Sequence, residues 1–293
     1  NGGDDAIDRL CRAVLEPGRD LVMHAPTFEM IERGGRLAGA GVRSIEWMEG
    51  PIRTDAVIGQ IDGRTAMVAL VTPNNPTGGV IGLDELRSIV KASARVGAVV
   101  LVDLAYVEFA DEDPTDALLA EGNVVIVRTF SKAMGLAGLR VGYAIAPVEV
   151  ARWLRTTGGP YPVSTVSLAL AGRSLERGAE RTAFIERVRA ERARLSETLR
   201  RCGGAVMESQ ANFVLARFDG DGAAAVHAGL LAQGISVRRF IGRPELMDCL
   251  RITLPGDEDA SDRLSKAVEQ VCATSSVRNR MANQGETGDT RNG

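Results

Sequence analysis

The stretch TFSKAMGLAGLR (129–140) places a lysine among residues that suit a reaction centre. Lys132 follows Ser131 directly, small and apolar residues come next, and Arg140 stands eight positions later. A lysine held among apolar neighbours gives up its proton readily and can form a Schiff base with an aldehyde. Hydroxyl groups and an arginine are groups that bind phosphate. The stretch therefore indicates a lysine that works beside a phosphate-bearing molecule.

Two further polar segments follow short apolar runs. TPNNPTGGV (72–80) is a rigid loop rich in amide groups, although a simple turn with side-chain-to-backbone hydrogen bonds would have the same composition. DLAYVEF (103–109) begins with Asp103, whose carboxylate is costly to bury at the end of an apolar strand without a cationic partner. Tyr106 follows three residues later and can reach the same space.

The order of apolar runs predicts the elements that position these residues. Six short, β-branched runs are expected strands: 20–25, 42–47, 66–71, 97–103, 123–129 and 141–146. Helical patterns separate most of them, notably at 27–37, 84–96 and 147–157, and an amphipathic helix follows the first glycines. This alternation predicts a three-layer α/β/α domain with a mostly parallel sheet, whose working residues collect at the carboxyl ends of the strands.

The second half has a different character. A helical region over 164–201, broken near Gly178, precedes expected strands at 205–217, 235–240 and 248–254 and expected helices at 221–233 and 257–273. The dense Glu/Arg pairing of the long helix favours a solvated face over an RNA-binding patch. We expect a large domain over 1–160, a smaller α+β domain over 161–275 that includes the connecting helix, and a disordered tail or linker over 276–293.

Composition limits the possible partners. The 293 residues carry a net charge of −3, which gives no electrostatic reason to expect nucleic acid or an anionic membrane. No apolar run reaches the roughly eighteen residues of a membrane span. The four scattered cysteines and two histidines favour neither a metal site nor a disulfide framework, so we expect no metal and a cytoplasmic location.

Together the strand ends offer a carboxylate, an amide, a phenol, hydroxyls, a lysine and an arginine. A flat heteroaromatic cofactor with a ring nitrogen, a phenolic oxygen, an aldehyde and a phosphate would use each of these groups. The motifs PNNPTG, DxAYxEF, TFSKAMGLAGLRVGY, PYPVS and CLRIT also resemble, in order and spacing, those of the fold-type I, pyridoxal-phosphate-dependent aminotransferases of class I/II. The resemblance runs to about residue 273, and the histidinol-phosphate aminotransferases are the most similar branch.

The resemblance implies a role for each motif residue. Lys132 would form the Schiff base with pyridoxal 5′-phosphate and shuttle a proton, and Asp103 would pair with the pyridine nitrogen. Hydrogen bonds from Asn75 and Tyr106 would reach the phenolic oxygen, while Phe28 would stack on the ring unless it serves only as core. The remaining cofactor ligands are expected around the phosphate: Thr129, Ser131, Arg140 and the backbone of Gly3 and Asp4.

The resemblance also implies substrate contacts in the smaller domain. Arg251, in CLRIT, would bind an α-carboxylate where the substrate has one. Arg238 and Tyr161 match the residues that would meet the substrate's phosphate end, and Asn212 would lie nearby. Arg239 and Arg243 are alternatives to Arg238. The Asn75–Pro76 bond is expected to be cis, as in relatives, and His24 and His227 are interpreted as structural.

Three departures from the family pattern stand out. Leu104 occupies a position where the family more often has glutamate, so we expect altered tuning of the site. Phe28 replaces a tyrosine common in the most similar branch. The N-terminal arm that covers the active site in relatives is absent from the sequence, which we interpret as truncated. Relatives build their active sites at a dimer interface, so a homodimer is expected.

The resulting hypothesis is amino transfer from histidinol phosphate to 2-oxoglutarate in histidine biosynthesis. Transamination of aromatic amino acids and decarboxylation of a threonine-phosphate-type substrate remain alternatives with the same cofactor. A transcription regulator that carries this domain, or a pseudoenzyme, are alternatives of another class. The amino donor and the 2-oxo acid are the expected partners, and neither nucleic acid nor membrane is.

Overall fold

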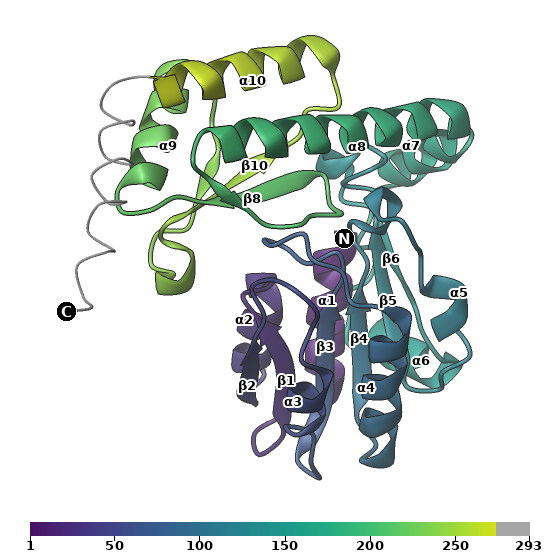
Figure 1. Cartoon of the computed structure of the whole chain (residues 1–293). Coiled ribbons are helices and arrows are strands. Elements are labelled where there is room, and N and C mark those ends of the chain that lie inside the picture. The colour runs from purple at the N-terminus through teal and green to yellow at the C-terminus, as the bar shows by residue number, and fades with distance from the viewer. Residues whose placement is uncertain (274–293) are drawn as a thin grey trace, which may run out of the picture. The chain divides into compact units, whose positions relative to one another are not determined.

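A six-stranded sheet organises the first part of the chain, in the order β2-β1-β3-β4-β5-β6 (Figure 1). The structure, a computed structural model, describes residues 1–273. The strands are β1 (Asp20–Ala25), β2 (Gly41–Glu46), β3 (Thr65–Val71), β4 (Val99–Asp103), β5 (Val124–Thr129) and β6 (Gly142–Ile145). All neighbouring pairs are parallel except β5 and β6. The predicted α/β fold with a mostly parallel sheet is therefore confirmed.

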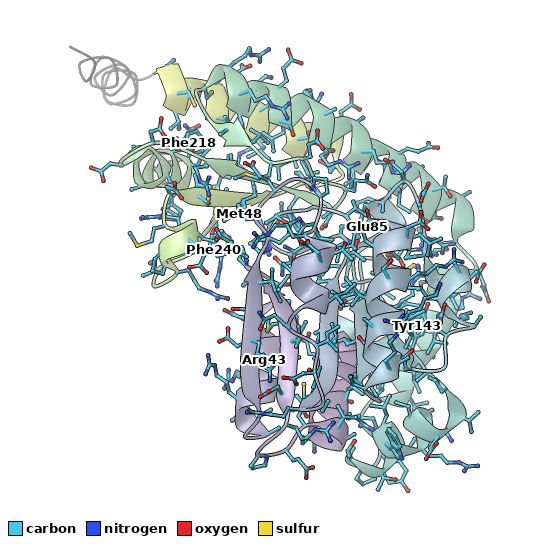
Figure 2. All side chains as sticks on the ribbon, turned by 60° about the horizontal axis from the view of Figure 1, so that its bottom comes forward. Arg43, Met48, Glu85, Tyr143, Phe218 and Phe240 are labelled. Carbon is cyan, nitrogen blue, oxygen red and sulfur yellow. The ribbon has the colours of Figure 1, made fainter. Side chains whose placement is uncertain are left out.

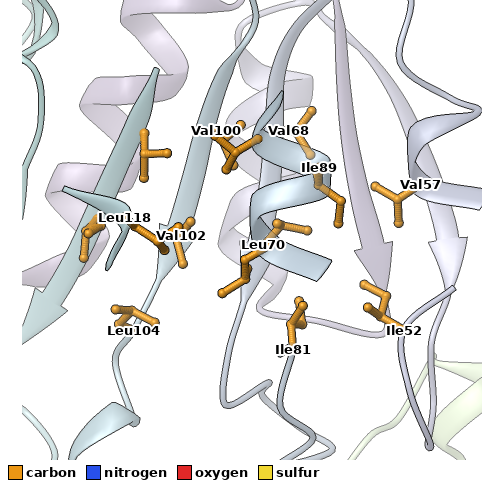
Figure 3. Packing of buried hydrophobic residues seen from close by; sticks show 14 of the residues in the cluster. Ile52, Val57, Val68, Leu70, Ile81, Ile89, Val100, Val102, Leu104 and Leu118 are labelled. Carbon is orange, nitrogen blue, oxygen red and sulfur yellow. The ribbon is translucent and has the colours of Figure 1, made fainter. Parts of the chain in front are cut away.

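Helices cover both faces of this sheet, as its doubly apolar strands require. One face packs against α1 (Gly2–Val14), α2 (Glu29–Leu37) and α6 (Val148–Thr156), and the other against α3 (Thr54–Ile58), α4 (Leu83–Arg95) and α5 (Thr115–Leu118). Alternate residues of one strand enter the two cores: Leu101 packs on the α1 side, whereas Val100 and Val102 join the core under α4 (Figure 3). The side chains that form each of the two cores are almost fully buried.

Parallel pairing brings the carboxyl ends of the central strands to one edge. Val71 lies opposite Asp103, and Asp103 lies opposite Val127. The segments that follow these strands include the short 3₁₀ helices η1 (Val107–Phe109) and η2 (Ala137–Leu139). The polar segments singled out in the sequence therefore meet at one edge of the sheet.

The chain divides into two compact units after Thr182, later than the expected boundary at residue 160. The reason is α7 (Thr165–Leu175), whose Ala171 packs with Phe130 and Val141 of the first unit. The next helix, α8 (Gly178–Arg201), begins at the expected break. Within residues 1–273, no helix has the length and apolarity needed to cross a membrane.

The second unit starts at Ala183 and contains an antiparallel sheet in the order β7-β8-β10-β9. Its strands are β7 (Ala205–Val206), β8 (Phe213–Arg217), β9 (Arg238–Arg239) and β10 (Cys249–Thr253), with α9 (Gly222–Ala232), α10 (Glu258–Ala273) and the 3₁₀ helix η3 (Pro244–Leu246). The predicted continuous strand at 205–217 is wrong, because Ser209 bonds to Phe213 O and Ala211 N and so interrupts it with a turn. The expected tail at 276–293 lies outside the described residues.

The charged face of α8 is explained by ion pairs to α10. Arg194 pairs with Asp262, and Arg201 pairs with Glu269, at 3.2 and 2.9 Å. Both pairs are about half exposed. This arrangement agrees with the interpretation of the Glu/Arg pattern as a solvated helix face.

Candidate active site

Lys132 is the chain's best-placed amine for covalent chemistry. The sequence contains three lysines, of which Lys91 and Lys266 lie exposed on α4 and α10. Lys132 is half-buried in the loop after β5, and its Nζ lies 5.1 Å from the centre of the buried Tyr106 ring. A cation over a tyrosine face is attracted by the ring, so this contact orients the amine.

Asp103 supplies a buried carboxylate close to that lysine. Its side chain is 4% exposed at the end of β4, and Oδ1 accepts a hydrogen bond of 3.0 Å from the Ala105 amide. Burial raises the pKa of Asp103 to about 6; the Ala105 bond and the Lys132 charge lower it, and the Asp4 charge raises it. A carboxyl with this environment favours a cationic partner in the site.

The first turn of α1 forms a cradle of backbone N–H groups beside Thr129. An added Cβ on Gly3 would lie 3.3 Å from Val127 Cγ1 and 3.9 Å from Thr129 Cβ. Thr129 Oγ1 donates to Ser131 Oγ at 2.9 Å and accepts from the Ser131 amide at 3.1 Å. Because a helix N-terminus with adjacent hydroxyls attracts anions, this corner suits a phosphate.

Gly142 permits the close approach of α1 to β6. A Cβ at Gly142 would lie 2.6 Å from the Gly3 amide nitrogen and 2.9 Å from the Arg128 carbonyl oxygen. Backbone groups cannot yield to such a contact, so a side chain there would push the helix away. The cradle therefore depends on a glycine far from it in the sequence.

Arg140 brings a guanidinium to the same corner. Its Nη2 donates to Asp4 Oδ2 at 3.0 Å, and an added Cβ on Gly2 would lie 2.7 Å from that nitrogen. Both side chains of the ion pair are about half exposed, so the pair contributes little to stability and an anion can replace it. Arg140 also has φ of 54°, a left-handed conformation that costs a non-glycine residue roughly 1–3 kcal/mol and persists where the surroundings fix it.

The loop after β3 is fixed by a buried amide that the sequence did not single out. Asn74 donates from Nδ2 to Pro26 O and Thr77 Oγ1, and its Oδ1 accepts from Thr27 Oγ1 at 2.7 Å. Its neighbour Asn75, the predicted ligand, is half-buried, and the Asn75–Pro76 bond is cis as expected. The Ala25–Pro26 and Thr72–Pro73 bonds are cis as well.

Phe28 and Leu104 flank the site in different ways. Phe28 precedes α2, is half-buried and packs at the margin of the core on the α1 side, so its predicted stacking role stays a prediction. Leu104 is fully buried in the core under α4, on the opposite side of the sheet from Leu101 and Asp103. His24 is fully buried, its Nε2 accepts from the Val71 amide, and burial lowers its pKa to about 3, which fits a structural role.

The second unit contains an arginine-rich pocket. Arg238 and Arg251 are direct neighbours across β9 and β10. They line an open pocket of about 450 Å³ together with His227, Ser236, Val237, Arg239, Ile241 and Thr253. The Arg251 guanidinium lies 5.1 Å from the Phe213 ring centre, and that of Arg238 lies 5.9 Å from the Phe240 ring centre. In the described part of the chain, no carboxylate lines this pocket, so it favours anions.

Two predicted substrate residues, Tyr161 and Asn212, do not line the pocket of the second unit. Tyr161, in the first unit, is 95% exposed with φ of 56°. Asn212 lies just before β8, where its carbonyl accepts from the Leu254 amide, and is not among the residues that line the pocket. The roles of both residues stay predictions.

The first-unit residues fit pyridoxal 5′-phosphate. A buried carboxyl of raised pKa suits a protonated ring nitrogen, and a glycine-lined helix N-terminus with hydroxyls and Arg140 suits a phosphate. Lys132 lies over the ring of Tyr106, which stands three residues after Asp103, and Lys132 follows Thr129 in the loop after β5. Sequence reasoning missed Asn74, Gly142 and the ion pair of Glu108 with Arg128, although Glu108 and Arg128 stand in or beside the quoted motifs.

Comparisons with known proteins show the family to which the chain belongs. A family model described as aminotransferase class I and II matches residues 1–268. Histidinol-phosphate aminotransferases of Pectobacterium atrosepticum and Xanthomonas euvesicatoria are 36% and 38% identical to the chain, over 92% of it and 76% of their own length.

Solved structures show the same fold. The histidinol-phosphate aminotransferase of Sinorhizobium meliloti, in complex with pyridoxal-5′-phosphate, has a TM-score of 0.80 at 24% identity and covers 91% of this chain and 73% of its own. The N-succinyldiaminopimelate aminotransferase of Mycobacterium tuberculosis has a TM-score of 0.79 at 22% identity, with 92% and 76% covered. The chain belongs to the class I and II aminotransferase family and is a transaminase that depends on pyridoxal 5′-phosphate.

Proposed function

We propose that this chain transfers the amino group of histidinol phosphate to 2-oxoglutarate in histidine biosynthesis. The similarity to relatives that carry this name supports the proposal. The observation that carries the substrate class is the pocket of the second unit, where Arg238 and Arg251 lie side by side. Two neighbouring guanidinium groups suit a phosphate dianion better than an apolar or aromatic side chain.

The residues at the strand ends would perform the chemistry. Bound pyridoxal 5′-phosphate supplies an aldehyde and a ring that withdraws electrons from the reacting carbon. Lys132 would hold the aldehyde end and later carry, on Nζ, the proton taken from the substrate carbon that bears the amine. Asp103, which is ionised above about pH 6, would keep the ring nitrogen protonated. Asn75 and Tyr106 would contact the phenolic oxygen.

Two sets of residues would bind the charged ends. Thr129, Ser131, Arg140 and the α1 N-terminus would hold the cofactor phosphate. Arg251 would bind the α-carboxylate of the 2-oxo acid, and Arg238 would add a second guanidinium for the substrate phosphate. Arg239 also lines the pocket and is an alternative ligand for the substrate phosphate. Arg243 lies 3.7 Å from Glu245 and does not line the pocket, so it is the weaker candidate.

A substrate comparison tests this proposal. Purified protein loaded with cofactor is assayed with histidinol phosphate, phenylalanine and threonine phosphate, with 2-oxoglutarate as acceptor. We expect the highest kcat/KM for histidinol phosphate, and a loss of about tenfold to a hundredfold in Arg238→Gln but not in Arg243→Gln. Higher kcat/KM for phenylalanine, or decarboxylation of threonine phosphate without amino transfer, would contradict the proposal.

A homodimer and a cytoplasmic location complete the proposal. Several apolar side chains of α7 are exposed in the single chain: Val166, Leu168, Leu170 and Leu175, at 47–68%. An exposed row of this kind supports an interface with a second copy, to be checked by light scattering of the purified protein. All four cysteines are free thiols, which supports a reducing compartment.

A further inference from the structure

A buried ion cluster lies behind the residues that face the cofactor. Arg128, in β5, donates from Nη2 to Glu108 Oε1 and from Nη1 to Asp113 Oδ2, each at 2.8 Å. The side chains of Arg128 and Glu108 are only 15% and 13% exposed, whereas that of Asp113 is 44% exposed. Tyr143 of β6, labelled in Figure 2, is the cross-strand neighbour of Arg128.

Within residues 1–273, the Glu108–Arg128 pair leaves two of its buried polar atoms without a hydrogen bond, although Arg128 Nη1 also donates to Asp113 and Thr115. Arg128 Nε and Glu108 Oε2 are buried and have no hydrogen-bond partner among the described residues. Burying such a pair costs desolvation that its attraction barely offsets, and an apolar pair of equal size would be as stable or more so. Stability therefore does not account for the pair, and its position in the fold becomes the relevant property.

That position connects two segments of the active site. Glu108 belongs to η1, which begins directly after Tyr106, and Arg128 immediately precedes Thr129. Val127 packs on the α1 side of the sheet and Ile126 on the α4 side, so alternation places Arg128 on the face away from the phosphate cradle. Two residues before Glu108, the Tyr106 ring lies under Lys132 Nζ.

We propose that Glu108 and Arg128 are positioning residues that fix Tyr106 against Lys132. The pair ties η1 to β5, so the phenol is held at a set distance from the lysine loop. This inference rests on the proposed role of Tyr106 at the cofactor's phenolic oxygen. The matched control is Asp113, which binds the same guanidinium but belongs to the segment that leads into α5.

The first test needs no cofactor. Amide hydrogen exchange is measured by mass spectrometry on the full chain without pyridoxal phosphate, for Glu108→Gln and Asp113→Asn. Exchange over residues 104–110 is compared with that over the central strand 65–71, which cancels any general loss of stability. We expect this ratio to rise about tenfold in Glu108→Gln and to stay within about twofold in Asp113→Asn. Glu108→Asp keeps the charge but shortens its reach, and should give the same pattern if Glu108→Gln folds poorly. An unchanged ratio in the folded variants would overturn the proposal.

The second test asks whether the pair acts through Tyr106. The absorbance of the cofactor-loaded protein is titrated with pH for Glu108→Gln, Tyr106→Phe and the double variant. We expect Glu108→Gln to move the midpoint in the direction of Tyr106→Phe, and to add no further shift in the double variant. Additive shifts would overturn the proposal. If Tyr106→Phe alone moves nothing, the assigned role of Tyr106 is wrong, and this failure is distinguishable because the exchange experiment reports on the pair separately.

Discussion

Asp103→Asn should have opposite effects on the empty and the loaded protein. Burial raises the pKa of this carboxyl from 3.8 to about 6, so the folded state binds its proton more tightly than the unfolded state. Its contribution to the free energy of unfolding is therefore full below about pH 4 and is lost as the pH rises through 6. At about 1.4 kcal/mol per pKa unit, the loss at pH 8 is about 3 kcal/mol.

An asparagine at this position has the same shape and can accept the Ala105 hydrogen bond without a charge to bury. The cofactor-free variant should therefore unfold on the order of 5 °C above the wild type at pH 8, and the gain should shrink to about 1 kcal/mol at pH 4.5. With cofactor bound, the ring nitrogen loses its charged partner, so kcat should fall about a hundredfold to a thousandfold. Thermal unfolding at several pH values and steady-state assays measure the two effects.

Asp113→Asn is the control with the opposite sign. Burial raises the pKa of Asp113, but hydrogen bonds with Thr115 and the charge of Arg128 hold it below its usual value. This substitution should therefore destabilise the cofactor-free protein at pH 8. If Asp103→Asn gave no gain in stability without cofactor, the carboxyl would not be desolvated as the structure shows. A wild-type kcat of Asp103→Asn with cofactor bound would refute the role assigned to Asp103.

Three further predictions concern the phosphate corner and the second-unit pocket. Arg140→Gln should weaken cofactor binding about tenfold to a hundredfold in an absorbance titration, while Asp4→Asn, which removes only a half-exposed pair, should leave it within a few-fold; equal losses would contradict the assignment. Gly142→Ala should lower the free energy of unfolding by about 1–3 kcal/mol because its Cβ would lie 2.6 Å from a backbone nitrogen of α1, whereas Gly138→Ala meets no atom within 4 Å and should be nearly neutral. Arg251→Lys should raise the KM for 2-oxoglutarate about tenfold or more, since lysine cannot form the two-point contact with a carboxylate; an unchanged KM would place the carboxylate elsewhere.

Much of the first unit could be predicted because its information is local. The strands are short β-branched runs whose burial on both faces leaves a continuous apolar pattern, and the polar segments after them mark one edge of the sheet. Asp103 is an example, since a carboxylate at the end of such a run requires a special environment. The second unit was harder to predict from the sequence. Ser209 interrupts the expected strand at 205–217 through hydrogen bonds that leave no periodic pattern in the sequence.

Residues whose roles depend on distant contacts could not be found from sequence. Gly142 matters because the first turn of α1, about 140 positions away, approaches its backbone. Arg128 interrupts an apolar run, which signals an unusual residue, but its partner Glu108 is fixed only by the pairing of β4 with β5. The expected boundary at 160 missed the packing of α7 on the loop that carries Phe130.

The central claim is that Lys132 is the amine that holds the cofactor. Borohydride reduction of the loaded protein fixes the cofactor covalently to whichever amine binds it, and peptide mapping by mass spectrometry identifies that residue. Few side-chain amines compete for the cofactor, because the sequence contains three lysines and two of them, Lys91 and Lys266, are exposed on helices. We predict that the label lies on Lys132 and is lost in Lys132→Ala. A label on Lys91 or Lys266, or none on the loaded wild-type protein, would contradict the assignment.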